Sequence, residues 1–106
     1  MYQEITPYDL EKRLNSSSQL ILLDVREEFE LKISSIQDSI HIPINEIPDK
    51  INDLDPKKNY VVVCKSGIRS AYVCEYLIKN KFKSVKNLAG GINEWAKKID
   101  SSLPVY

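Results

Sequence analysis

Short apolar runs alternate with amphipathic segments along the chain. The runs "LILLD" (20–24) and "YVVVC" (60–64) are continuous, which is typical of strands buried on both faces of a sheet. Two shorter segments, "DSIHIP" (38–43) and "SVKNL" (84–88), also fit strands, and a proline closes the first. Strands separated by amphipathic helices predict an α/β chain with a mostly parallel sheet covered on both faces.

The segments between these runs carry helix signals. Thr6 and Pro7 are typical of a helix start and predict a helix over 7–16, which the polar segment "SSSQ" (16–19) ends. The charged segment "REEFELKI" fits a short helical turn. Apolar residues recur at helical spacings in three further segments, which predicts helices over 44–54, after residue 64 and after the glycine pair at 90–91.

Length and composition predict one soluble domain spanning residues 1–106. The chain is 42% hydrophobic and 28% charged, and its 15 Lys and Arg balance 15 Asp and Glu. This balance argues against nucleic acid or an anionic membrane as the partner. No apolar run approaches the roughly 20 residues of a membrane helix, and the N-terminus lacks the pattern of a secretory signal. We therefore expect a cytoplasmic protein.

Cys64 stands where the second buried strand ends and a loop leads into a helix. In parallel sheets, ligands bind at such positions. The backbone amides of residues 65–70 can form an anion-binding nest, with Gly67 allowing the turn and Arg69 adding positive charge. Such a site suits an oxyanion substrate and an anionic covalent intermediate on the cysteine. This hypothesis requires amides that face the sulfur and a sulfur that solvent can reach.

Four blocks, in order along nearly the whole chain, resemble the rhodanese family of single-domain sulfurtransferases. They are "LLDVRE" (22–27), "IHIP" (40–43), "CKSGIRSA" (64–71) and "NLAGGINEW" (87–95). The tail "IDSSLPVY" is similar to the end of rhodanese domains that follow sulfur-carrier adenylyltransferases. The resemblance implies a three-layer α/β/α fold with a sheet of about five strands.

The resemblance also implies a persulfide cycle. Cys64 takes sulfane sulfur from thiosulfate, or from a protein donor, and passes it to cyanide, a thiol or a protein acceptor. Arg69 holds the loop or the oxyanion, Lys65 draws the dianion inward, and Asp24 and Arg26 brace the loop. No metal and no cofactor is expected. The residues implied to bind the substrate and the persulfide are Lys65, Ser66, Gly67, Ile68, Arg69 and Ser70.

Several of these residues also have plainer interpretations. Lys65 fits a solvated loop residue as well as a substrate-steering one. Asp24 and Arg26 fit a structural ion pair at the end of a strand as well as a brace for the loop. Cys74 lies on the apolar stripe of its helix, so we expect a buried core thiol rather than a second reactive cysteine.

The chain departs from the family between the matching blocks. A usual "GHIPGA" is replaced by "SSIQDS" (34–39), which includes Ser34 and Ser35 where the family has its Gly-His pair. His41 aligns instead with the asparagine of the family's "NIP" strand, and fits a packed or surface histidine better than a metal ligand. The glycine pair at 90–91 fits a tight turn, because no G-x-G-x-x-G pattern follows it.

Two other functions compete with sulfur transfer. Cysteine phosphatases and arsenate reductases also combine a cysteine, an amide nest and an arginine. They carry C-x5-R, whereas Cys64 and Arg69 form the tighter C-x4-R. From a different class, a noncatalytic rhodanese-like module would recruit or regulate a partner, or carry sulfur that a partner supplies. The complete loop argues against an inactive module and leaves the partner-dependent carrier open.

Overall fold

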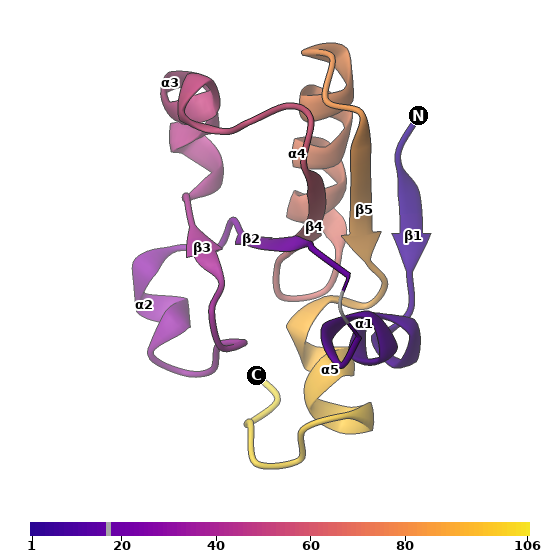
Figure 1. Ribbon diagram of the computed structural model, residues 1–106. Coiled ribbons are helices and arrows are strands. Elements are labelled where there is room, and N and C mark those ends of the chain that lie inside the picture. Colours follow the sequence, from indigo (N-terminus) through magenta and orange to yellow (C-terminus); the bar gives the residue numbers. More distant parts are fainter. Residues whose placement is uncertain (17) are drawn as a thin grey trace.

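One parallel sheet forms the centre of the molecule (Figure 1). The computed structural model describes residues 1–16 and 18–106. The strands are β1 (Gln3–Ile5), β2 (Ile21–Asp24), β3 (Ile40–His41), β4 (Asn59–Val63) and β5 (Ser84–Leu88). They are ordered β1-β5-β4-β2-β3, and every neighbouring pair is parallel. The predicted parallel sheet of about five strands is therefore confirmed.

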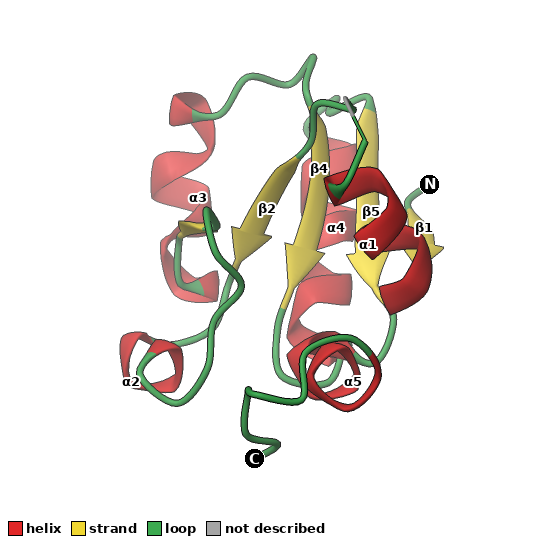
Figure 2. Cartoon of the chain, turned by 60° about the horizontal axis from the view of Figure 1, so that its bottom comes forward, coloured by secondary structure: helices red, strands yellow, loops and turns green. Residues whose placement is uncertain are grey.

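Helices cover both faces of this sheet. They are α1 (Pro7–Leu14), α2 (Glu28–Leu31), α3 (Ile47–Lys50), α4 (Ile68–Lys79) and α5 (Gly91–Lys98). The helices α1 and α5 pack on one face, and α3 and α4 pack on the other. In Figure 2 the sheet stands between α1 in front and α4 behind. This is the expected three-layer α/β/α arrangement.

Two hydrophobic clusters, one on each face, explain why the strand sequences are continuously apolar. Val61 and Val63 pack with residues of α1 and α5, whereas Val62 and Cys64 pack with residues of α3 and α4. Each residue from 61 to 64 therefore meets an apolar layer on its own side. Trp95 is buried in the cluster that contains α1 and α5, as its spacing on the last helix predicts.

The short strand β1 is the one that the sequence pattern does not indicate. Two of its three residues are exposed and only Ile5 is buried, so it carries no apolar run. Its place in the sheet comes from parallel pairing with β5, in which Glu4 lies opposite Asn87. Pairing with a distant strand, rather than local sequence, makes this segment a strand.

Two helix boundaries also differ from expectation. The helix expected over 44–54 is interrupted, with α3 lying between 3-10 turns at Ile44–Glu46 and Ile51–Asp53. Pro48 has no N–H to donate to the preceding turn, which favours this break. The first helix ends at Leu14, and the break expected at 16–19 includes residue 17, which lies outside the described residues.

The carboxyl ends of the parallel strands lie along one edge of the sheet. Asp24, the last residue of β2, is opposite Val63, the residue before Cys64. The end of β2 and the start of the loop after β4 are therefore neighbours. Across residues 1–16 and 18–106, no helix has the length and apolar character needed to cross a membrane.

Candidate active site

Cys64 follows β4 directly, and its side chain meets two polar groups. Its Sγ accepts a hydrogen bond from the backbone N–H of Gly67, with a distance of 3.1 Å between nitrogen and sulfur. The Ser70 hydroxyl oxygen lies 3.2 Å from the same sulfur. Residues 64–70, called the active loop below, therefore turn back over the end of their own strand and bring polar groups to the thiol.

The start of α4 supplies the amides of the predicted nest. Gly67 is the N-cap residue, and its φ of 102° lies in the left-handed region that glycine adopts without strain. The Ala71 N–H donates to the Gly67 carbonyl, so the amides of residues 68–70 have no partner within the helix. Among the described residues, Gly67 supplies the one backbone N–H that bonds to Sγ. The nest around the free thiol is thus smaller than the six amides that the sequence predicts.

The sulfur is closed off from solvent in this conformation. Cys64 is 0% exposed, whereas Ser66 and Ile68 in the same loop have exposed side chains. The sequence-based hypothesis requires a sulfur that solvent can reach, and this conformation does not provide one. A reaction between Cys64 and any donor therefore requires the side chains that cover the sulfur to move.

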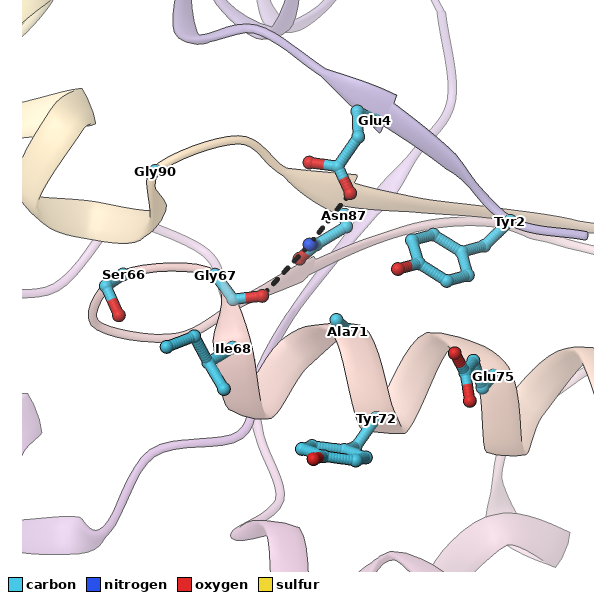
Figure 3. A pocket seen from close by; sticks show the side chains of 10 residues that line it. All are labelled: Tyr2, Glu4, Ser66, Gly67, Ile68, Ala71, Tyr72, Glu75, Asn87 and Gly90. Carbon is cyan, nitrogen blue, oxygen red and sulfur yellow. Dashed lines mark hydrogen bonds between the residues drawn. The ribbon is translucent and has the colours of Figure 1, made fainter.

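A chain of hydrogen bonds leads from the sulfur to the edge of the sheet. The Ser70 hydroxyl donates to Oδ1 of Asn87, which lies on β5. The Nδ2 atom of Asn87 donates to the Gly67 carbonyl at 3.1 Å and to Oε2 of Glu4 at 3.0 Å (Figure 3). Asn87 is only 3% exposed, so these three partners fix its amide. Asn87 thereby contacts both loop residues that touch the sulfur.

Arg69 is paired with a buried carboxylate on α2. Its Nη1 lies 2.7 Å from Oε2 of Glu30, and its Nη2 lies 2.8 Å from Oε1 of Glu30. The hydrogen bonds from Arg69 lower the pKa of Glu30 to about 2 and raise the pKa of Arg69 itself. The contact joins α4 to α2 and fits the first of the two roles expected for Arg69, holding the loop.

Arg26 and Asp24 form a fully buried ion pair at the end of β2. The Nη2 atom of Arg26 lies 2.8 Å from Oδ2 of Asp24. Arg26 also donates to the carbonyl oxygens of Glu30 at 3.3 Å and Ser34 at 2.7 Å. Among the described residues, neither Asp24 nor Arg26 has a hydrogen bond to the active loop. Their connection to the loop runs through Glu30, so the bracing that the resemblance implies is indirect in this structure.

Tyr106 completes this ionic network. Its hydroxyl donates to Oε1 of Glu30 at 2.8 Å and accepts from Nη1 of Arg26 at 2.9 Å. Asn93 holds the backbone of Tyr106 with two hydrogen bonds of 2.8 and 3.1 Å. The Nζ atom of Lys65 stands 5.0 Å from the centroid of the Tyr106 ring, a cation–π contact. The tail is therefore docked beside the first loop residue.

The turn between β5 and α5 holds the start of the active loop. The Ile92 N–H donates to the Cys64 carbonyl at 2.8 Å. Gly90 and Gly91 both have positive φ, which confirms the tight turn that the sequence predicts. A Cβ atom on Gly91 would collide with the carbonyl of Lys65, so only glycine fits this close approach of two backbones.

The remaining cysteine and the histidine occupy structural positions. Cys74 is a fully buried free thiol, and burial raises its pKa to about 12, as expected for a core residue. Nε2 of His41 lies 2.6 Å from the carbonyl oxygen of Arg26. In the part of the chain that the structure describes, no group of three His, Cys, Asp or Glu side chains could hold a metal ion.

A cleft of about 470 Å³ lies beside the active loop, between β1 and α4 (Figure 3). Gly67 and Asn87 form part of its wall on the loop side, and Glu4 and Glu75 both line it. Cys64 is not among its lining residues. The cleft therefore reaches the loop from the side of the Asn87 amide and not from the side of the thiol.

Glu30, Asn87 and Tyr106 contact expected site residues, although sequence reasoning does not identify them. Asn87 opens the block "NLAGGINEW" and Tyr106 ends the tail "IDSSLPVY", so the resemblance marks their segments without marking the residues. Glu30 gives no signal, because an acidic residue in a short charged helix is usually solvated. Its burial depends on the distant partners Arg69 and Tyr106.

Comparisons with known proteins agree with the fold. Residues 6–98 match the family model of the rhodanese-like domain. YtwF of Bacillus subtilis, named as a candidate sulfurtransferase, is 40% identical over 93 residues, which cover 88% of this chain and 89% of that protein. A sulfurtransferase of Allochromatium vinosum is 33% identical over 97 residues, which cover 92% of this chain and 91% of that protein.

Solved structures show the same architecture. The rhodanese-related protein of Thermoplasma volcanium superimposes with a TM-score of 0.82 at 37% identity, covering 99% of this chain and 98% of that one. The rhodanese-like domain protein of Staphylococcus aureus gives a TM-score of 0.85 at 33% identity, covering 98% of each chain. Both likenesses extend over almost the entire length of the chain.

Proposed function

Because the chain belongs to the rhodanese-like domain family, we propose that it is a thiosulfate sulfurtransferase that carries sulfane sulfur as a persulfide on Cys64. The observation that carries this proposal is the position of Cys64 at the N-terminus of α4. Its sulfur accepts the Gly67 N–H, and the next three amides have no helical partner. Such a helix start stabilises negative charge on the thiolate and on the terminal sulfur of a persulfide.

The proposed cycle has two steps. The Cys64 thiol loses its proton to solvent, and the thiolate attacks the sulfane sulfur of thiosulfate. A new S–S bond forms at Cys64, the S–S bond of thiosulfate breaks, and sulfite leaves with the electron pair. A thiophilic acceptor such as cyanide then attacks the outer sulfur, and thiocyanate leaves as Cys64 returns to the thiolate. Neither step needs a metal or a cofactor.

The contacts of Arg69 argue against phosphoryl chemistry. A phosphatase of this kind uses its arginine to bind the equatorial phosphoryl oxygens, and such binding needs a free guanidinium. Here both terminal nitrogens of Arg69 are bonded to Glu30, in a loop one residue shorter than C-x5-R. The same pair leaves Arg69 to fix the loop rather than to bind the donor directly. We therefore place sulfur transfer ahead of phosphate ester hydrolysis.

The burial of Cys64 favours a second candidate, a sulfur carrier that receives sulfur from a partner protein. A thiol that is 0% exposed reacts only when the side chains that cover it move aside, and a docked protein donor can displace them. The relatives include the adenylyltransferase and sulfurtransferase MOCS3 of Arabidopsis thaliana, 28% identical over 118 residues that cover 96% of this chain and 25% of that protein. In either case we propose a cytoplasmic location, which fits two free cysteines.

The test is a measurement of intact mass after incubation with a sulfur donor. With thiosulfate, the protein gains one sulfur atom, and cyanide removes it. Cys64→Ser gains none, whereas the matched variant Cys74→Ser behaves like the parent, because Cys74 lies in the core. If Cys64→Ser gains sulfur as the parent does, the persulfide is not on Cys64. If thiosulfate fails but a cysteine desulfurase with cysteine loads the protein, the second candidate replaces the first.

A further inference from the structure

We propose that Asn87, oriented by Glu4, is a positioning residue that holds both groups in contact with the Cys64 sulfur. The proposal rests on the proposed function, because it concerns the rate at which Cys64 takes up sulfur. Asn87 lies on β5, outside the active loop, and among the described residues it has no hydrogen bond to the sulfur. Its three hydrogen bonds reach Gly67, Ser70 and Glu4.

The partners of Asn87 fix the direction of its amide. Its Nδ2 faces the Gly67 carbonyl and the Glu4 carboxylate, and both of these only accept hydrogen bonds. A flipped amide would place Oδ1 against these two acceptors and leave them without a donor. Oδ1 is therefore directed at Ser70, whose single hydroxyl proton is committed to Asn87.

This commitment decides how Ser70 meets the sulfur. With its proton on the Asn87 side, the Ser70 oxygen presents a lone pair to Cys64 at 3.2 Å. The thiol proton of Cys64 is then donated to Ser70, while the Gly67 N–H is donated to the sulfur. Both interactions fix the position of the resting thiol before the donor arrives. In the thiolate that attacks the donor, the Gly67 N–H remains the donor to the sulfur, because the Ser70 lone pair accepts only from the protonated form.

The bond to the Gly67 carbonyl has a separate effect. Glycine is the most flexible residue type, and Gly67 sits in the left-handed region at the N-cap of α4. Without an external contact, its peptide groups can rotate and turn the N–H away from the sulfur. A buried side chain anchored on β5 opposes this rotation better than a contact within the loop would.

The position of Glu4 follows from the sheet register. Glu4 and Asn87 are directly opposite each other on the parallel pair β1 and β5, so their side chains share one face. Figure 3 shows the Glu4 carboxylate reaching the Asn87 amide, and Glu75 on the opposite wall of the cleft. Glu75 has the same charge, and its side chain is exposed as well, but it has no hydrogen bond to Asn87 among the described residues. It is therefore the matched control.

The experiment measures the rate of persulfide formation in a single turnover with excess thiosulfate, followed by intact mass. Asn87→Ala slows the reaction by about tenfold, because both groups on the sulfur lose their hold. Glu4→Ala slows it by about threefold, the effect of losing one hydrogen bond, and Glu75→Ala leaves it unchanged. Equal rates for Glu4→Ala and Glu75→Ala overturn the role of Glu4. A parent-like rate for Asn87→Ala overturns the proposal.

A double-mutant cycle separates positioning from a general loss of structure. If Asn87 acts in part through the hydroxyl, Asn87→Ala causes a smaller loss in the Ser70→Ala background than in the parent. If the two substitutions reduce the rate independently, so that their fold-changes multiply, Asn87 does not act through Ser70. The stability of each variant is measured by urea denaturation. Glu4 is exposed, so Glu4→Ala should fold and can still test the proposal if Asn87→Ala does not fold. If the parent forms no persulfide, the proposed function itself fails, which is a different outcome from an insensitive Asn87.

Discussion

The active loop is held from two directions by contacts of different kinds. On one side Arg69 is paired with Glu30, and the network continues to Tyr106 and the buried Arg26–Asp24 pair. On the other side the Asn87 amide holds Gly67 and Ser70 by single hydrogen bonds. Buried charges are costly to leave unpaired, whereas neutral bonds contribute about 1 kcal/mol each. The first set supplies strength, and the second set supplies orientation at the sulfur.

The two sets also come from different parts of the chain. The ionic side is built mainly from residues 24–34, joined by Tyr106. The amide side is built from β5 and β1, the edge of the sheet farthest from β3. Damage to the ionic side should therefore appear first in the free energy of unfolding. Damage to the amide side should appear first in the rate of reaction at Cys64.

The largest effect is expected from removing the charge of Arg26. Arg26→Met leaves the Asp24 carboxylate buried without its partner and removes the donors to Glu30 and Ser34. The free energy of unfolding should fall by about 3–5 kcal/mol, as for other broken buried ion pairs. Urea denaturation measures it through the midpoint and the slope.

A second variant shows whether the cost comes from the unpaired charge. Asp24→Leu combined with Arg26→Met replaces the pair by apolar residues and should recover part of the stability that Arg26→Met loses. A fall below about 1 kcal/mol for Arg26→Met would show that the ionic side does not supply the strength assigned to it. The comparison between the two sides of the loop would then be wrong.

The second-largest effect is expected on the stability of the protein in acid, through the Arg69–Glu30 pair. Arg69 lowers the pKa of Glu30 from 4.5 to about 2, so the pairing stabilises the fold fully above the unfolded-state value. This contribution, about 3 kcal/mol at neutral pH for a shift of that size, is lost as the pH falls from about 4.5 through about 2. Parent and Glu30→Gln should therefore differ in stability at neutral pH and converge in acid. Urea denaturation at a series of pH values follows this convergence.

A neighbouring acid provides the control. Glu28 lies on the same short helix and is exposed, and Glu28→Gln should follow the parent throughout the pH series. A constant difference between Glu30→Gln and the parent at every pH would contradict the pairing as the source of stability. The contribution would then come from packing of the side chain rather than from its charge.

Most of the fold follows from the sequence because the strands and helices of the centre are determined by local apolar patterns. The runs that become β2 and β4 are continuous because each faces two apolar layers. The edge strand β1 cannot be predicted from a local pattern, because Ile5 is its one buried residue and its pairing partner lies more than 80 residues away in the sequence. In the segment 44–54 the apolar spacing is regular, but the missing N–H of Pro48 favours the break before α3.

The residues of the candidate site also differ in whether local sequence predicts them. Cys64, Gly67 and Arg69 are visible in the sequence, because the chemistry of a strand end followed by a helix start is local. Glu30 and Asn87 are not visible, because their roles come from side chains that meet only after the sheet has formed. The closed state of the thiol is also invisible, since it depends on how the whole loop packs against the sheet.

The smallest effects are expected at the outer edge of the ionic side, where the Tyr106 ring meets Lys65. Tyr106→Phe removes the hydroxyl between Glu30 and Arg26 but keeps the ring under Lys65. The loss should be about 1–2 kcal/mol. Two hydrogen bonds to charged groups disappear, but Tyr106 is only half-buried, so water can replace its hydroxyl, and both ion pairs stay intact. Lys65→Met is the reciprocal variant: it keeps the hydroxyl, removes the cation over the ring, and should cost at most about 1 kcal/mol.

If Tyr106→Phe instead matches the loss in Arg26→Met, the tail is an equal member of the buried network. A loss in sulfur uptake without any loss of stability would move Tyr106 to the orienting side of the loop.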